Sequence, residues 1–372
     1  MAPPTLLEIY KHQCTLTRNL QLGIIVLFSD DLLMLNSIQT LRALAAWLVV
    51  FHHYMQIAHN FKLTDGVSLA LFKYGAIGVD LFFVISGFVI YLSASAKSVT
   101  PQTFALHRIA RIAPAYWAFT MITAALLIYA PGVVPLTLYD PVFLIKSLLF
   151  IPAQNPSGIG IFPIITVGWT LNYEMAFYVV FLFSLFAPAK LRIPAIVVGV
   201  FLLRKAVPEL GGDFVFFKNK IVYEFLFGIF IAYAFQKGLI QKIPTTIAVL
   251  MAAIALWKIV GNGPVSHDPF RSGLPCAAIL VAAVSQERYF SRIGFFGKLG
   301  DWSYSTYLCH VLVICLMIEV QRILNLNDWT TFALIVLGIG AVSCASFNLV
   351  ERPISRFTKN KSKSSLPVNP SA

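Results

Sequence analysis

Residues 38–58 read IQTLRALAAWLVVFHHYMQIA, an apolar run that is interrupted by one arginine and two adjacent histidines. The run is long enough to cross a bilayer as a helix, because a helical span needs about 20 residues. Ionisable side chains inside such a span are costly, which makes Arg42, His52 and His53 candidates for a function. The stretch therefore predicts a membrane helix that carries chemistry.

The composition extends this prediction to the whole chain. Of the 372 residues, 58% are hydrophobic and only 12% are charged, which is typical of a polytopic membrane protein and not of a soluble domain. We therefore expect an all-α integral membrane protein. The net charge of +12 favours basic cytoplasmic flanks over nucleic-acid binding. The five cysteines show no CxxC spacing, so we expect neither a disulfide framework nor a metal site.

Apolar stretches separated by basic residues, Pro or Gly predict about ten transmembrane helices. Their expected limits are 38–58, 74–95, 112–130, 165–187, 191–207, 220–236, 243–260, 273–287, 300–324 and 329–350. The stretch 131–164 is too broken to cross, and we expect a loop with a short interfacial helix there.

The distribution of charge predicts the orientation. Most of the 28 Lys and Arg residues fall on the inside if the N-terminus and the C-terminus are both cytoplasmic. We expect a poorly ordered or non-native extension over 1–35, a transmembrane domain over 36–352, and a basic cytoplasmic tail over 353–372. The tail is rich in Ser and Pro toward its end, and we expect it to be disordered and to touch anionic lipid.

The first predicted helix places two of its ionisable groups on one face. Arg42 and His53 are eleven positions apart, which at 3.6 residues per turn brings them to within about 20° and separates them by about 16 Å along the axis. His52 points elsewhere. In a purely structural alternative, Arg42 reaches lipid headgroups and His53 bonds to a neighbouring helix.

The second span carries one acid, and two arginines directly precede the third span. Asp80 lies near the outer end of the second span, where it could fix the tautomer of a histidine, and Ser86-Gly87 would let another helix approach closely. Arg108 and Arg111 are three apart and share one helical face at the cytoplasmic boundary. Two guanidinium groups there suit phosphate binding, although ordinary positive-inside flanks look the same.

The fourth span, TVGWTLNYEMAFYVVF, places Glu174 in an apolar helix, four residues before Tyr178. A buried carboxylate there could orient and charge an imidazole opposite it. The ninth span carries His310 near mid-membrane. Cys309 beside it could be imagined as an acyl-carrying nucleophile, but nothing marks it as activated. For most of these groups an ordinary structural role is the alternative.

Together these motifs resemble the acyltransferase 3 family of bacterial membrane proteins over about residues 36–358. The ordered elements are Arg42-x10-His53, GVDLFFVISGF, the RxxR of the third span, GWTLNYEMAFY, SYSTYLCH and ERP. The GWTLNYEMAFY form is most similar to the branch that decorates exopolysaccharides such as succinoglycan. The resemblance implies transfer of an acyl group, usually acetyl, from a cytoplasmic acyl-CoA to a sugar hydroxyl, in the inner membrane.

The resemblance also implies roles for the candidate residues. His53 would be the general base, and Glu174 or Asp80 would steady the imidazolium that forms. The cofactor cations would be Arg42, Arg108 and Arg111, and Tyr178, Asn172 or Arg42 would stabilise the oxyanion. The expected substrate-binding residues are Trp169, Asn172, Tyr173, Tyr178, Ser303 and His310.

Three alternatives stay open at this point. Intramembrane His, Glu and Arg also occur in proton-coupled transporters and glycan flippases, which would move a glycan precursor without acyl transfer. The chain could instead be a non-enzymatic partner of a polysaccharide synthase. A third alternative keeps the chemistry but uses another short acyl group. The acceptor could be polymeric or lipid-linked.

Overall fold

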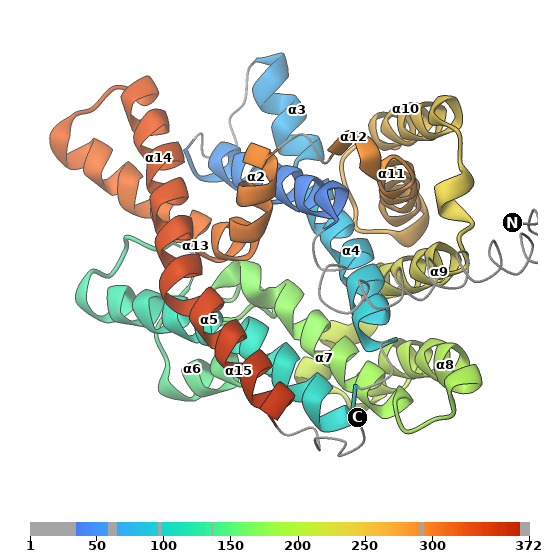
Figure 1. Cartoon of the computed structure of the whole chain (residues 1–372). Coiled ribbons are helices and arrows are strands. Elements are labelled where there is room, and N and C mark those ends of the chain that lie inside the picture. Colours follow the sequence, from blue (N-terminus) through green and yellow to red (C-terminus); the bar gives the residue numbers. More distant parts are fainter. Residues whose placement is uncertain (1–34, 59–64, 96–98, 136, 291–293, 365–372) are drawn as a thin grey trace, which may run out of the picture.

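The described part of the chain is helical, and its one isolated pairing of extended backbone joins Gln154 to Ile161, so this part contains no sheet. A computed structural model describes residues 35–58, 65–95, 99–135, 137–290 and 294–364 (Figure 1).

The helices vary widely in length. The α-helices are α2 (Asn36–Ala58), α3 (Gly66–Tyr74), α4 (Ile77–Ala94), α5 (Pro101–Tyr129), α6 (Pro141–Leu148), α7 (Trp169–Ser184), α8 (Arg192–Lys205), α9 (Glu224–Gln236), α10 (Thr245–Gly261), α11 (Leu274–Ser285), α12 (Glu287–Phe290), α13 (Gly294–Leu324), α14 (Asp328–Ser346) and α15 (Arg352–Ser364). Short 3-10 or π turns are η2 (Thr166–Gly168), η3 (Ala189–Leu191), η4 (Val207–Leu210), η5 (Gly212–Lys218), η6 (Lys220–Tyr223), η7 (Ile240–Lys242), η8 (Pro269–Gly273) and η9 (Phe347–Glu351).

Each of the ten expected spans contains a helix, which confirms the all-α class, and their apolar composition agrees with a membrane protein. Among the described residues, four helical stretches are long and apolar enough to cross a membrane alone, namely Gly66–Ala94, Pro101–Tyr129, Gly294–Leu324 and Asp328–Thr358. Several of the other helices are much shorter, such as α11. Ten crossings and two cytoplasmic termini therefore stay predictions.

The boundaries differ most from expectation at two places. The third expected span begins at Pro101 and not near 112, because Thr100 caps the helix by accepting a hydrogen bond from the backbone of Thr103. The expected disordered end is wrong as far as Ser364, since α14 continues through η9 into α15 (Figure 1). The interfacial helix expected within 131–164 corresponds to α6. Residues 1–34 and 365–372 lie outside the described residues.

Glycines set the closest helix crossings. α2 packs against α4 and α13, and a Cβ on Gly78 or Gly300 would lie 2.2 Å from a carbonyl oxygen of α2. α4 and α9 approach equally closely, since a Cβ on Gly87 would lie 2.1 Å from the carbonyl oxygen of Phe225. This confirms the close approach predicted from Ser86-Gly87. These crossings bring α2, α4 and α13 together around the candidate site.

Candidate active site

Two cavities lie next to each other among α2, α4, α7 and α13. The first has a volume of about 400 Å³ and the second about 510 Å³. Val79 of α4 and Tyr307 of α13 line both of them. The two residues therefore form a wall that the cavities share.

The first cavity gathers the predicted cations. Arg42 of α2 and Arg108 and Arg111 of α5 all line it, although they are far apart in sequence. α5 contributes two of them because it begins at Pro101, so Arg108 and Arg111 lie on consecutive turns of one helix. The expected grouping of the three arginines is therefore present.

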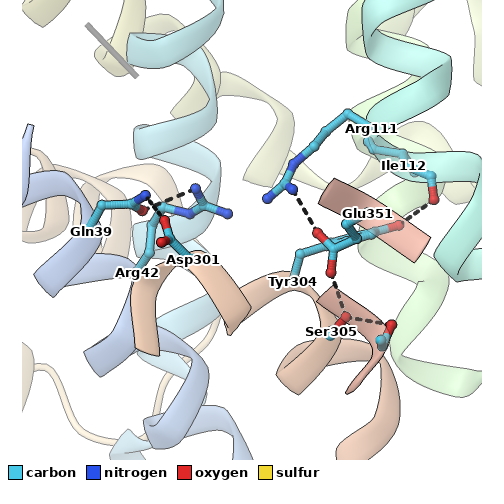
Figure 2. A network of polar contacts seen from close by, with 9 residues as sticks. Gln39, Arg42, Arg111, Ile112, Asp301, Tyr304, Ser305 and Glu351 are labelled. Carbon is cyan, nitrogen blue, oxygen red and sulfur yellow. Dashed lines mark hydrogen bonds and ion pairs between the residues drawn. The ribbon is translucent and has the colours of Figure 1, made fainter. Parts of the chain in front are cut away.

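Arg111 is neutralised by a buried acid. Its Nη1 lies 2.6 Å from Glu351 Oε2, and Ser305 Oγ donates to Glu351 Oε1 at 2.5 Å (Figure 2). Tyr304 lies beside this pair and donates its hydroxyl to the carbonyl of Ile112 at 2.7 Å. The network ties α5, α13 and η9 together, so Arg111 has a structural partner.

Arg42 and Arg108 keep more of their charge available. Arg42 Nη1 donates to Gln39 Oε1 at 3.3 Å, and Gln39 Nε2 donates to Asp301 Oδ1 at 2.5 Å (Figure 2). Arg108 Nη2 donates to Ser93 Oγ at 3.4 Å. Within the described ranges neither arginine has a carboxylate at ion-pair distance. Both can therefore bind an anionic ligand.

Glu174 belongs to the first cavity and not to His53. Its Oε1 accepts hydrogen bonds from Ser86 Oγ and from Tyr178 Oη, both at 2.6 Å. The predicted contact between Glu174 and Tyr178 is thus confirmed. The expected contact of Glu174 with the imidazole of His53 is wrong. Helix α7 directs this carboxylate toward α4 in the first cavity, whereas His53 lines the second. The Tyr178 hydroxyl proton is also committed to Glu174, which weakens its assignment as an oxyanion donor.

His53 lines the second cavity and is fixed by a second histidine. Its Nδ1 lies 3.0 Å from the carbonyl oxygen of Val49 and 3.1 Å from His310 Nε2. His310 Nδ1 lies 3.2 Å from the carbonyl of Thr306. Carbonyl oxygens only accept, so in the neutral rings each Nδ1 carries the hydrogen and His310 Nε2 accepts from His53. This leaves the lone pair of His53 Nε2 for a proton, and no hydrogen bond to Nε2 is found within the described residues.

His52 is committed on both of its ring nitrogens. Nδ1 lies 2.8 Å from the carbonyl oxygen of Phe72, and the side-chain amide of Gln56 lies 3.0 Å from Nε2. The two rings make different contacts, but His52 also lines the second cavity beside His53, so the expectation that it points elsewhere is wrong. The hydrogen bond from His53 to His310 of α13 also agrees with the structural alternative, in which His53 bonds to a neighbouring helix. Its Nε2 nevertheless stays free for a proton.

Asp80 serves a different histidine from the one expected. It is buried in the first turn of α4, and its Oδ2 lies 2.9 Å from Nδ1 of His267. The expected support of His53 by Asp80 is therefore not found. Sequence reasoning missed His267, because a histidine in the polar break between α10 and α11 resembles any other loop residue. His267 and Asp80 are 187 positions apart in the sequence, and only the fold brings them into contact.

The remaining substrate-binding predictions divide among three places. Trp169 and Tyr173 line the second cavity, whereas Tyr178 and Ser303 line the first. Asn172 is 2% exposed and lines neither cavity, so its assignment to substrate or oxyanion stays a prediction without structural support. His310 also lines neither and reaches the site only through His53. In the described residues no group of three or more His, Cys, Asp or Glu side chains could hold a metal ion.

The chain matches known acyltransferases over most of its length. The acyltransferase domain family matches residues 35–350. The exopolysaccharide production protein ExoZ of Rhizobium meliloti is 32% identical over 83% of this chain and 95% of the relative. Acyltransferase MdmB of Streptomyces mycarofaciens is 26% identical over 75% of this chain and 79% of the relative. The peptidoglycan O-acetyltransferase OatA of Listeria monocytogenes is 27% identical over 86% of this chain and 56% of the relative.

No solved structure is significantly similar to the chain. The family match covers α2 to α14, and of the residues that line the two cavities only Ser355 and Thr358 of α15 lie outside it. The chain belongs to the acyltransferase 3 family and is an acyltransferase.

Proposed function

We propose that the protein transfers an acetyl or other short acyl group from cytoplasmic acyl-CoA to a hydroxyl of an exopolysaccharide or related surface glycan, in the bacterial inner membrane. The observation that carries this proposal is the pair of adjoining cavities, one lined by arginines and the other by imidazoles. The names of two relatives, an exopolysaccharide production protein and a peptidoglycan O-acetyltransferase, support a glycan acceptor.

The first cavity suits the donor. Coenzyme A carries several phosphate charges, and guanidinium groups bind phosphate oxygens through paired hydrogen bonds. Arg42 and Arg108 lack carboxylate partners in the described residues, so they are the binding cations. Arg111 holds the wall of the cavity through its ion pair with Glu351.

The two cavities are lined by residues that lie near opposite ends of the expected membrane spans. His107 and Ser355, which line the first, come from segments whose charge predicts the cytoplasmic side. Phe162, Phe216 and His267, which line the second, come from segments expected on the opposite side. The donor therefore enters from the cytoplasm and the acceptor from the other side.

The second cavity suits proton transfer. The sugar oxygen attacks the thioester carbonyl while His53 Nε2 takes the hydroxyl proton, the C–S bond breaks, and the imidazolium returns the proton to the thiolate of coenzyme A. His310 Nε2 and the Val49 carbonyl accept from Nδ1–H and so stabilise the imidazolium. The acyl group passes directly to the sugar without a covalent acyl-enzyme.

The shared wall marks the route of the thioester. Tyr307 donates its hydroxyl to the carbonyl of Val167 at 3.0 Å and lies 2.9 Å from Thr170 Oγ1. Its ring centroid lies 5.8 Å from that of His310. An extended pantetheine arm in the first cavity must pass Tyr307 and Val79 to bring its thioester to His53. Tyr307 thus keeps water of the second cavity away from the donor until then.

The test is transfer of labelled acetyl from acetyl-CoA to polysaccharide purified from a host strain that lacks the protein. We expect His53→Gln to reduce the rate by about 10²–10⁴-fold, the usual contribution of a general base. Cys309→Ser is the matched control, because Cys309 is buried, lines neither cavity and contacts Ser343. It is expected to keep the parent rate.

Each alternative gives a different result in the same assay. Full activity of His53→Gln would overturn the assignment of the base. Acetyl found on His53 or Cys309 after incubation with acetyl-CoA alone would contradict direct transfer. Movement of glycan across the membrane without consumption of acetyl-CoA would favour a flippase or transporter.

A further inference from the structure

Besides His52 and His53, a third imidazole lines the acceptor cavity, and a carboxylate holds it. His267 lines the second cavity with its side chain 22% exposed, while the side chain of Asp80 beneath it is fully buried. Asp80 Oδ2 accepts from Nδ1–H of His267 at 2.9 Å. No hydrogen bond to Nε2 is found in the described part of the chain, so this nitrogen presents a lone pair on the side of the ring away from Asp80.

A second acid lies behind Asp80. Glu224 of α9 is 0% exposed and lies beside Asp80. Asp80 Oδ1 and both carboxyl oxygens of Glu224 lack other partners in the described residues. A carboxylic acid at Glu224 can donate its proton to the free oxygen of Asp80, which completes a chain of three groups ending at His267. Gly273 leaves room for the Glu224 side chain, since a Cβ at position 273 would lie 2.8 Å from Glu224 Oε1.

The loop around His267 is built to hold this ring in place. His267 has a φ of +53°, a backbone conformation that costs free energy in a residue other than glycine. Asp268 next to it accepts from the backbone of Phe270 at 3.0 Å and from Lys220 Nζ at 3.3 Å. Such strain persists only where the surroundings enforce it, and it often marks a functional residue.

Aromatic side chains flank the histidine. The ring centroid of Trp169 lies 5.6 Å from that of His267 and 5.9 Å from that of Tyr173. Tyr173 in turn stacks on Phe216, with ring centroids 4.3 Å apart. An aromatic face next to one polar acceptor matches a sugar ring, which has an apolar C–H face and hydroxyl groups around its edge.

We propose that His267 positions the acceptor sugar by accepting a hydrogen bond from a hydroxyl next to the one that His53 deprotonates, with Asp80 and Glu224 fixing its ring. This inference rests on the proposed function and adds the residue that selects the hydroxyl. His267 orients the acceptor and is not the base, because the loop that carries it contributes no residue to the first cavity, where the donor binds. His53 lies on α2, the helix that also carries Arg42 into the first cavity.

The first test compares His267→Ala with His267→Gln, using acetyl-CoA and polysaccharide from the deletion strain. We expect His267→Ala to raise the KM for polysaccharide about tenfold, the effect of one lost hydrogen bond, with the KM for acetyl-CoA unchanged. We also expect acetyl to spread over more than one sugar position in the NMR spectrum. His267→Gln keeps an acceptor oxygen and is expected to recover part of the acceptor KM. An unchanged acceptor KM, or a loss confined to kcat and as large as that of His53→Gln, would overturn the inference.

The second test perturbs Glu224 through a neighbouring residue, without replacing Glu224 itself. Gly273→Ala places a methyl group 2.7 Å from Glu224 Cγ and is expected to raise the acceptor KM by a smaller factor. Gly261→Ala is its control, because a Cβ there has nothing within 4 Å. Equal acceptor KM values for the two variants would contradict the role of Glu224.

Binding separates this inference from the proposed function. The dissociation constant of the polysaccharide for purified protein, measured by calorimetry without acetyl-CoA, is expected to rise about tenfold in His267→Ala. Unchanged binding in the folded variant would contradict the inference alone. A parent protein that binds polysaccharide but transfers no acetyl would contradict the proposed function alone.

Discussion

The two cavities differ in how their polar groups are satisfied. In the first, Arg111 is paired with Glu351, Glu174 accepts two hydroxyl hydrogen bonds, and Arg108 is left to attract an anion. In the second, His53 and His267 each have Nδ1 held and Nε2 open. The difference supports the proposed division of tasks, in which one region binds the charged acyl donor and the other moves protons on a neutral acceptor. Helix α2 reaches both.

The largest effect expected from a residue outside both cavities is that of His310→Ala. Without His310 the ring of His53 keeps only the Val49 carbonyl as a partner, so its tautomer and orientation are less well fixed. We expect kcat to fall by roughly 10²-fold, within the range of general-base contributions, with the KM for acetyl-CoA unchanged. Initial rates at varied acetyl-CoA provide the measurement. A raised KM with kcat intact would show that the tasks are not divided between the cavities.

A smaller effect is expected for Arg108→Ala. Loss of a charged hydrogen-bond donor to phosphate raises the KM for acetyl-CoA about tenfold, while kcat stays near that of the parent. S-acetylpantetheine lacks the phosphates of coenzyme A, so parent and variant should use it equally well. Arg322→Ala is the control, because Arg322 is exposed at the end of α13 and pairs with Glu319. An equal defect with S-acetylpantetheine would exclude phosphate binding by Arg108.

The smallest effect concerns stability and distinguishes Arg111 from Arg108. Glu351→Gln removes the charge that pairs with Arg111 at a side chain that is 2% exposed, whereas Glu319→Gln removes the partner of Arg322, which is 76% exposed. We expect a loss of roughly 1–2 kcal/mol for the first, because Arg111 is partly solvated, and less than about 0.5 kcal/mol for the second. Thermal unfolding in detergent measures both. Equal shifts would remove the structural role given to Arg111.

Contacts within one helix were predictable from the sequence. The bond from Tyr178 to Glu174 follows from their spacing of four, and the placement of Arg42 and His53 along one helix follows from the helical rise and period. The close crossing at Gly87 also followed, because a small residue in an apolar helix permits such contact.

Contacts between helices were less predictable. Glu174 and Asp80 were both expected near His53, but Glu174 lies in the first cavity and Asp80 pairs with His267. Which face of α7 or α4 meets which neighbour depends on the packing of the whole bundle, and nothing local encodes it. For the same reason Asn172, which lies on the same helix as Glu174, lines neither cavity.

The most direct test of the account is the side of the membrane from which each substrate enters. Sealed vesicles of known orientation would be given labelled acetyl-CoA on one face and polysaccharide on the other. Because acetyl-CoA does not cross the bilayer, we predict acetylation only when acetyl-CoA is at the cytoplasmic face and polysaccharide is at the opposite face. Transfer that requires both substrates on the same face would contradict the assignment of donor and acceptor to separate cavities.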